Sequence, residues 1–366
     1  MKTIFDGYRT ISAGGRVTYF AGSNTETGFR GLYDDIAEED RMERVYIIKG
    51  GSGTGKSTLM RKIADDAERQ GFGCTYYLCG SDPDSLDAVV LDNRIAVLDG
   101  TPPHAREMKY PGAASELIDV TRFWDKDVLT EKRESIRTLC TGKQQAFGTA
   151  YRYLKAAALL ERETYEITRQ MVDTDKISGF CRRMLTKAGK QIPPNGPKGK
   201  VQSVYTHGIG MQGMVCTDAF FLLTQNHYFI EDAYGTAGCF FDCLTEVCRD
   251  VGYDVLQARL PLNDRIAAAV IPALSLSLTV GGEYASDKTI HMTRFLKKEP
   301  LDKQKGKLRL ANKCMTSLLS DSAESFGEAG KAHFALEKIY VSAMDFTAMN
   351  RYTDTVREDI LKRLNV

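Results

Sequence analysis

The chain has 366 residues, and at ~100–200 residues per domain this length suggests two domains. Its 49 Lys and Arg residues and 48 Asp and Glu residues leave a net charge of +1, so we expect neither nucleic acid nor a membrane as a partner. The hydrophobic fraction of 43% and the charged fraction of 27% exclude wholesale disorder. No apolar run approaches the ~20 residues that span a bilayer, and the N-terminal sequence has no signal-peptide core, which predicts a cytoplasmic protein.

The nine cysteines are odd in number and include no Cys-x-x-Cys pair. Three of them, Cys239, Cys243 and Cys248, lie close together, but apolar residues separate them and no histidine accompanies them. This pattern favours reduced, buried cysteines over disulfides or metal ligands.

The strongest motif begins at Val45. A β-branched and aromatic run, Val45–Ile48, predicts a buried strand, and Leu59, Ile63 and Ala67 predict one face of a helix that ends near Gly71. Between them stands Gly-x-x-x-x-Gly-Lys-Ser at positions 50–57, a complete Walker A motif with the strand before it and the helix after it.

The Walker A motif predicts that the chain binds ATP with Mg²⁺. Glycines let successive backbone N–H groups surround the β-phosphate, and the helix N-terminus adds partial positive charge. We expect Lys56 to reach the β- and γ-phosphates, the Ser57 hydroxyl to ligate Mg²⁺ and Thr58 to bond the α-phosphate. The expected nucleotide-contacting residues are Gly50, Gly51, Ser52, Gly53, Thr54, Gly55, Lys56, Ser57 and Thr58.

The next two strands are expected at Cys74–Cys79 and Arg94–Leu98, and the second of them is followed by Asp99. Asp99 would lie at the carboxyl edge of the sheet, where it could hold Mg²⁺ through water or through Ser57 as a Walker B carboxylate. The alternative is a turn or capping residue, because Gly100-Thr101-Pro102 follows. Gly100 stands where many ATP-hydrolysing motors carry a water-activating Glu, which indicates slow or partner-triggered hydrolysis, or an acceptor other than water.

Three carboxylates lie in the loop after the second strand, Asp82, Asp84 and Asp87. They could orient a hydroxyl acceptor or a magnesium-bound water, or they could serve turn and helix-capping geometry. His104 could sense the γ-phosphate or be structural. Three further residues are candidates to stabilise the charge of the phosphates: Arg106, Lys109 and Arg122. Trp124, the single tryptophan, is expected to pack in a core.

The second half of the chain repeats the order of these features. Tyr228–Ile230 parallels Tyr46–Ile48, Ala269–Ile271 parallels Ala88–Val90, and Leu276–Leu278 parallels Ile95–Val97. We therefore predict two repeats, residues 1–185 and 201–366, joined by a Pro-, Gly- and Lys-rich linker over residues 186–200. Each repeat ends in a long helical region without a sustained heptad, which favours packing on its sheet over a coiled coil.

The second repeat lacks the phosphate chemistry of the first. Its loop has no lysine, Cys239 or Phe240 is expected at the magnesium-serine position, and Glu231 and Asp232 would repel phosphate. Val280 stands about where Asp99 would be. The second repeat is therefore predicted to be an architectural or regulatory copy that binds no nucleotide.

The segments GGSGTGKSTLMRKI, SDPDSLDAVVL, IAVLDGTPPH and YPGAASELIDV resemble an uncharacterised family of bacterial tandem P-loop ATPases. In that family each half carries a P-loop, a Ser/Asn-Asp-Pro-Asp-Ser-Leu-Asp segment and an Asp-Gly-Thr-x-Pro-His segment, and the resemblance covers nearly the whole chain. It implies nucleotide binding. Here the second half departs from the pattern because its P-loop is degenerate.

These observations predict an α/β protein with the P-loop NTPase fold, a mostly parallel sheet and a degenerate second copy. The favoured function is that of an ATP-binding, Mg²⁺-dependent ATPase that is slow or stimulated by a protein partner. Two alternatives stay open: a small-molecule kinase that holds its acceptor at the Asp82–Asp87 loop, and a non-catalytic nucleotide-gated scaffold.

Overall fold

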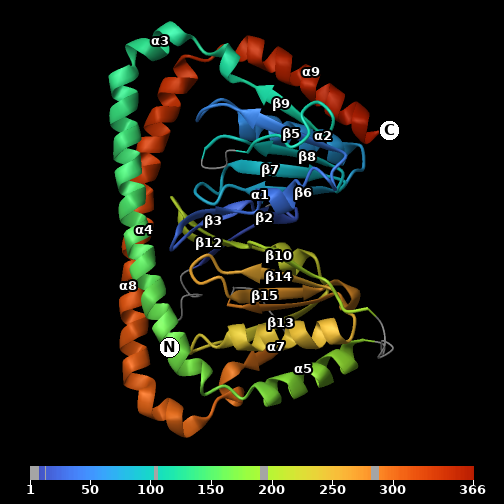
Figure 1. Ribbon diagram of the computed structural model, residues 1–366, viewed down its shortest axis with the longest axis vertical. Coiled ribbons are helices and arrows are strands. Elements are labelled where there is room, and N and C mark those ends of the chain that lie inside the picture. The colour runs from blue at the N-terminus through green and yellow to red at the C-terminus, as the bar shows by residue number, and fades with distance from the viewer. Residues whose placement is uncertain (1–7, 13, 103–105, 190–196, 282–287) are drawn as a thin grey trace.

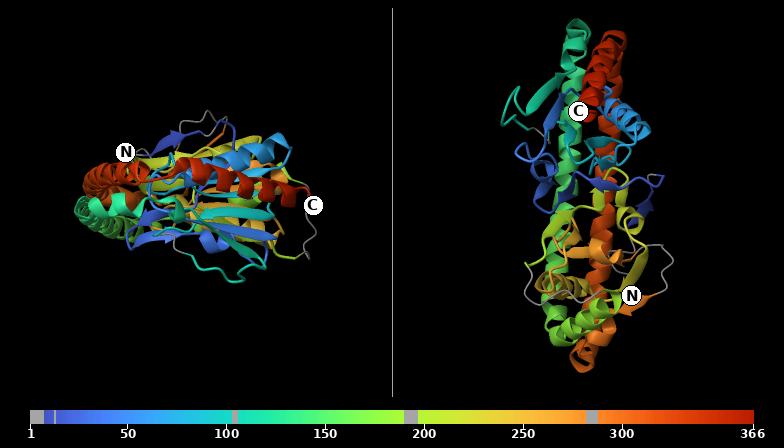
Figure 2. Two further views of the ribbon diagram at one scale, coloured as in Figure 1. Left: turned by 90° about the horizontal axis from the view of Figure 1, so that it is seen from above. Right: turned by 90° about the vertical axis from the view of Figure 1, so that its right-hand side faces the viewer.

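The computed structural model describes residues 8–12, 14–102, 106–189, 197–281 and 288–366. This part of the chain is a mixed α/β protein in which two six-stranded sheets lie one above the other and two long helices run along one side of both (Figure 1). Figure 2 shows the two long helices side by side at one edge of the molecule. Among the described helices, none has the length and apolar character that crossing a membrane requires.

The two large sheets have the same strand order. The first is β2-β6-β7-β8-β5-β9, formed by Thr18–Phe20, Cys74–Leu78, Leu86–Leu91, Ile95–Asp99, Arg44–Lys49 and Ser115–Asp119. The second is β10-β14-β15-β16-β13-β17, formed by Val201–Val204, Val255–Arg259, Ile266–Ile271, Leu276–Val280, Asn226–Glu231 and Thr289–His291. In both sheets the third strand is antiparallel to its neighbours and the other pairings are parallel.

Strand β5 is an inner strand of the first sheet, where it pairs with β8 on one side and with the edge strand β9 on the other. Its residues alternate between two apolar layers because successive side chains point to opposite faces. Tyr46 and Ile48 face the core shared with α2 (Lys56–Arg69), whereas Val45 and Ile47 face the core shared with α1 (Tyr33–Ile36). All four are fully buried, as the β-branched run predicts.

Smaller elements surround the two sheets. β1 (Arg9–Ile11), β12 (Gly213–Thr217) and β11 (His207–Gly210) form a three-stranded sheet, and β3 (Gly22–Thr25) pairs with β4 (Gly28–Gly31). Further helical segments of the described chain are η2 (Thr121–Phe123), α3 (Lys126–Glu131), α6 (Ala219–Leu222), α7 (Ala237–Asp250), η3 (Pro272–Leu274) and η4 (Met292–Phe295).

The expectation that each long helical region packs on its own sheet is wrong. Helix α4 (Arg133–Arg169) and helix α8 (Lys298–Ser342) run antiparallel and pack mainly on each other (Figure 1). Phe147 of α4 and Phe326 of α8 meet edge to face with ring centroids 5.6 Å apart. Each helix is long enough to reach from one sheet to the other, so each carries the chain across the molecule.

The helices that follow the long pair are exchanged between the halves. α5 (Thr174–Ala188) packs against α7 at the second sheet, and α9 (Phe346–Leu364) packs against α2 at the first. Matching backbone hydrogen bonds hold both crossings: the N–H of Asp345 donates to Phe123 O at 3.0 Å, and the N–H of Asp173 donates to Phe295 O at 2.9 Å. The sequence halves 1–185 and 201–366 are therefore interlocked in space.

Three details of the expected elements need correction. The strand β7 lies between the two strands that were expected to be consecutive, so β8 follows a hairpin. Strand pairing matches Ala268, and not Ala269, to Ala88, because these residues lie opposite Thr279 and Leu98 at the same register position. Helix α5 continues to Ala188, three residues into the expected linker, and residues 190–196 of that linker lie outside the described part of the chain.

Candidate functional site

The loop between β5 and α2 has a backbone that only glycine adopts readily. Gly53 and Gly55 have φ of +71° and +79°, in the left-handed region where other residues are strained. Gly50 is also closely packed, since a Cβ there would come within 2.6 Å of Thr54 Oγ1 and of Val120 Cγ2. The glycine spacing of the motif therefore has a steric cause in this structure.

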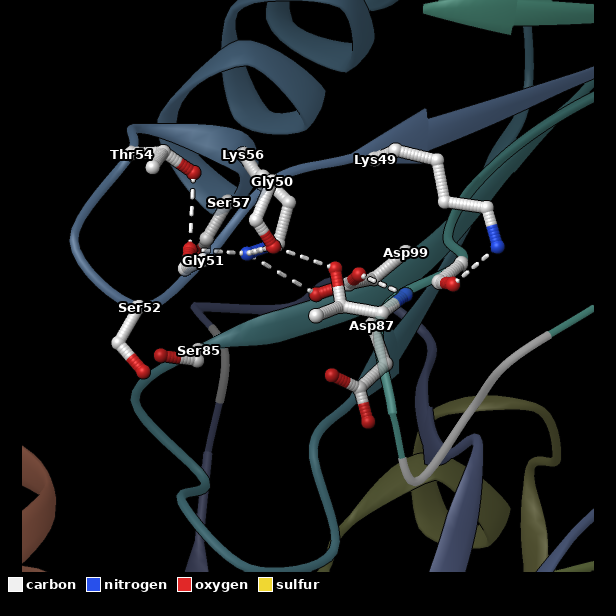
Figure 3. Close-up of polar contacts among 12 residues, drawn as sticks. Lys49, Gly50, Gly51, Ser52, Thr54, Lys56, Ser57, Ser85, Asp87 and Asp99 are labelled. Atoms are coloured by element: carbon white, nitrogen blue, oxygen red, sulfur yellow. Dashed lines mark hydrogen bonds and ion pairs between the residues drawn. The ribbon is translucent and has the colours of Figure 1, made fainter. Parts of the chain in front are cut away.

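Lys56 and Ser57 begin α2 and Asp99 ends β8, and Figure 3 shows the polar contacts of these residues at the loop. Lys56 Nζ donates to Gly51 O at 2.7 Å and to Gly50 O at 3.2 Å, and it lies 3.5 Å from Asp99 Oδ2. The N–H of Leu86 donates to Ser57 Oγ at 3.0 Å. Asp99 ends β8, next to β5 in parallel register, so both strands deliver their residues to one sheet edge.

Asp99 also makes the local turn that was the alternative to metal binding. Its Oδ1 accepts the N–H of Thr101 at 2.8 Å, and the Thr101 hydroxyl donates to Gly50 O at 2.7 Å. The other oxygen, Oδ2, faces the ammonium group of Lys56. Because the two roles use different oxygens, the turn and the position beside the lysine are compatible in one side chain.

The outer side of the loop is covered by residues that are distant in sequence. A Cβ on Gly53 would come within 2.6 Å of Glu337 Cγ and 2.8 Å of Val341 Cγ2, both on α8, and a Cβ on Gly51 would lie 3.0 Å from Trp124 Cζ2. Trp124 packs on Tyr340 of α8 with ring centroids 5.3 Å apart. The single tryptophan thus lies against the glycine loop.

Asp82 and Asp84 lie in the loop after β6, whereas Asp87 lies in β7, and all three carboxylates accept hydrogen bonds from protein side chains. Asp82 accepts the Ser85 hydroxyl at 2.8 Å, Asp84 accepts Gln212 Nε2 at 2.7 Å, and Asp87 accepts the Tyr33 hydroxyl at 2.8 Å. Asp82 and Asp87 are buried. These contacts correspond to the turn and packing alternative more closely than to an open acceptor site.

The other predicted residues are dispersed. Arg106 donates to Tyr33 O at 2.7 Å, Lys109 pairs with Asp40, and the Arg122 guanidinium lies over the Tyr352 ring at 5.2 Å. Thr58 is exposed in the first turn of α2. His104 lies outside the described residues.

In the second half, a side-chain carboxylate takes the hydrogen bonds of the corresponding loop. Asp232 Oδ2 accepts the N–H of Ala237 at 2.7 Å, and Oδ1 accepts the N–H of Thr236 at 2.9 Å and of Tyr234 at 3.3 Å. Asp232 is 5% exposed, and burial raises the pKa of its carboxyl while these donors oppose the shift. The anion-binding end of α7 is therefore filled by the chain's own carboxylate.

The helix starts and the strand register show which residues of the second half occupy the positions of Ser57 and Asp99. Ala237 begins α7 as Lys56 begins α2, which places Gly238, and not Cys239 or Phe240, at the position of Ser57. Val280 lies opposite Ile230 as Asp99 lies opposite Ile48, so Val280 matches Asp99. Glu231 is exposed and pairs with His291.

A second polar region lies on one face of the second sheet. A cavity there is lined by His207, Asp218, His227, Ser277 and Thr279, among others. Strand register matches His227 and Ser277 to Val45 and Ala96, which are packed apolar residues in the first sheet. Burial lowers the pKa of His207 to about 4. This cavity is remote in the fold from the glycine loop, and its lining contains no Walker residue.

Two residues near the glycine loop were not identified from the sequence, Lys143 of α4 and His333 of α8. His333 Nδ1 lies 3.4 Å from Ser52 Oγ and 3.3 Å from Lys143 Nζ. No motif surrounds either residue, and both stand within long helices. Only the pairing of α4 with α8 reveals them.

The nine cysteines are all free, as expected for reduced residues. Cys181, Cys243 and Cys248 are buried, but Cys140 and Cys314 are exposed, so burial does not hold for all of them. Within the described residues, no group of three or more His, Cys, Asp or Glu side chains is arranged to hold a metal ion. No protein-family model, curated protein or solved structure matches the chain.

Proposed function

We propose that the chain binds Mg²⁺ and ATP at residues 50–58 and hydrolyses ATP slowly or on stimulation by a partner, as a member of the tandem P-loop ATPases that its sequence resembles. The observation that carries the proposal is the convergence of Lys56 and Asp99, 3.5 Å apart, on a loop with left-handed glycines at Gly53 and Gly55. A cation, a carboxylate and a helix N-terminus at one sheet edge are the groups that a magnesium nucleotide requires.

The residues present fit a magnesium ion that arrives with its nucleotide. Ser57 and Asp99 would hold it, and a single carboxylate suffices because Mg²⁺ keeps water ligands and binds phosphate oxygens. When bound, the ion would neutralise charge on the phosphates. Lys56 would exchange its two loop-carbonyl acceptors for phosphate oxygens, which are stronger acceptors because they are charged.

Two features support slow hydrolysis with water as the acceptor. Gly100 supplies no carboxylate after Asp99, and a Cβ at Gly100 would come within 2.4 Å of Ile47 Cγ2, so this position has no room for a glutamate. The carboxylates Asp82 and Asp87 are buried and already bonded, which favours water over a small-molecule acceptor at their loop. We therefore rank the ATPase above the kinase.

The test is a titration with a fluorescent ATP analogue in the presence of Mg²⁺. Lys56→Met should lower the affinity about 100-fold or more, because it removes a charge-assisted contact to two phosphates. Lys62→Met, at an exposed position of the same helix, is the matched control and should bind normally. Equal affinities of the wild type and Lys56→Met would refute the nucleotide site.

Turnover separates the remaining alternatives. ADP release by the wild-type protein alone, at a low rate that Lys56→Met abolishes, is the expected result for the ATPase. ADP release only after addition of a metabolite pool would favour the kinase. Stoichiometric binding with no turnover under either condition would favour the scaffold.

A further inference from the structure

The long helices bring two polar side chains to the tip of the glycine loop. Lys143 comes from the first part of α4 and His333 from the last part of α8, 190 residues apart in the chain. Their contact at 3.3 Å joins the 3.4 Å contact between His333 and Ser52. These two contacts connect Lys143 through His333 to Ser52, so the long helices approach the loop from outside the first sheet.

Lys143 is a half-buried cation without a carboxylate partner. In the described part of the chain, no carboxylate oxygen lies within 4.0 Å of its ammonium nitrogen, which instead contacts the imidazole of His333 at 3.3 Å. Burial lowers the pKa of Lys143, and burial together with the Lys143 charge lowers that of His333 to about 4. A partly desolvated ammonium group is costly unless an anion compensates it.

The charges around this cluster leave room for such an anion. Asp82 is the acidic group that acts on His333, but its Oδ2 accepts the Ser85 hydroxyl at 2.8 Å. Lys56 acts on His333 as a second positive charge. Two further carboxylates lie at this loop, Asp99, which is 3.5 Å from Lys56, and Glu337 of α8. Neither lies within 4.0 Å of the Lys143 ammonium nitrogen, so Lys143 is the cation that is left for an anion.

The position of the contact on the loop indicates which anion it would be. Ser52 is the third residue of the Gly50–Ser57 motif, whose backbone surrounds the β- and γ-phosphates in proteins with this motif. A cation that approaches from outside this loop would meet the terminal phosphate rather than the α-phosphate. Cations delivered in this manner, from the same chain or from a partner, neutralise charge that develops during phosphoryl transfer.

We propose that Lys143 contacts the terminal phosphate of the bound nucleoside triphosphate and that His333 is a positioning residue that holds the lysine in place. This inference rests on the proposed function, because it requires a nucleotide at residues 50–58. It predicts that α4 and α8 respond to whether a triphosphate or a diphosphate is bound at the site, because only the triphosphate contacts Lys143.

The experiment compares Mg²⁺-dependent binding of ATPγS and of ADP by the full-length wild type, Lys143→Met, Lys143→Gln and His333→Gln. Lys143→Met and Lys143→Gln should weaken ATPγS binding about tenfold or more and leave ADP binding unchanged, because only the triphosphate offers the lysine an acceptor. His333→Gln should lower the same ATPγS-to-ADP selectivity by a smaller factor. Lys155→Met, an exposed lysine farther along α4, should change neither affinity.

The selectivity ratio distinguishes this role from a structural one. Equal losses for both nucleotides, or no loss for either in variants with unchanged thermal unfolding, would overturn the inference while the proposed function stands. A wild type that binds neither nucleotide would refute the proposed function instead. If Lys143→Met does not fold, the glutamine variant supplies the same comparison.

Discussion

Asp232 Oδ2 accepts the backbone N–H of Ala237 at 2.7 Å, at the start of α7, where the corresponding helix of the first sheet begins with Lys56. The carboxylate takes the hydrogen bonds that a phosphate would need, so the second loop offers a nucleotide no free donors at this point. We expect one ATP per chain. Calorimetric titration with Mg²⁺ present should give a stoichiometry near one, and two equivalent sites would contradict this prediction.

The same contact predicts the stability of a variant. Asp232→Asn puts an N–H₂ group against backbone donors in a buried site, so we expect the free energy of unfolding to fall by about 2–4 kcal/mol. Urea unfolding measures it. Glu231→Gln, at the exposed neighbouring position, should change it by no more than about 0.5 kcal/mol, and a similar loss in both variants would count against the buried-anion explanation.

Asp99→Asn should weaken nucleotide binding about tenfold with Mg²⁺ and not at all with EDTA, because the carboxylate is proposed to act through the ion. Calorimetry under both conditions decides this. Asp119→Asn is a matched control, since Asp119 ends the strand on the other side of β5 and makes the same turn, with Thr121 N–H at 2.9 Å. Equal losses with and without metal would assign Asp99 to the turn alone.

Gly53→Ala and Gly71→Ala separate backbone strain from steric contact. Both glycines have positive φ, but Gly71 has no atom within 4 Å of an added Cβ, whereas Gly53 faces Glu337 and Val341 of α8. We expect Gly71→Ala to cost about 1–2 kcal/mol of stability and to leave nucleotide binding intact. Gly53→Ala should cost more and also reduce nucleotide affinity, as urea unfolding and the fluorescent titration would show.

The buried histidine His207 predicts a loss of stability in acid. Its pKa of about 4 in the folded protein lies below the ordinary value of 6.5, so the unfolded chain binds the proton more readily. The stabilisation from the neutral imidazole is complete above about pH 6.5 and is lost as the pH falls towards 4, at up to ~1.4 kcal/mol per pH unit.

Urea unfolding at about pH 7 and about pH 5 tests this dependence. The wild type should lose about 2 kcal/mol from His207 between these values, and His207→Gln should lose correspondingly less, with the half-buried His227 and His333, whose pKa values are also lowered, contributing the remainder. An identical pH dependence of both proteins would contradict the assignment.

The sequence alone predicted the parts of this protein that depend on neighbouring residues. The strand, glycine loop and helix over residues 45–69 follow from local patterns, because side-chain alternation, left-handed glycines and helical spacing all act within a few residues. Asp99 at the sheet edge follows for the same reason. The sequence also predicted a turn at Asp99 as the alternative. In the structure Asp99 makes this turn with Thr101 and also lies beside Lys56.

Only the tertiary structure decided which distant segments meet. The antiparallel pairing of α4 with α8 depends on contacts between residues far apart in the chain, and neither helix has a sustained heptad pattern that predicts it. Because of this pairing, α5 packs at the second sheet and α9 packs at the first. The pairing also brings Lys143 to His333, and Glu337 and Trp124 lie against the glycine loop. Such contacts are selected by the total apolar surface that the whole chain buries, and a local sequence pattern does not contain that quantity.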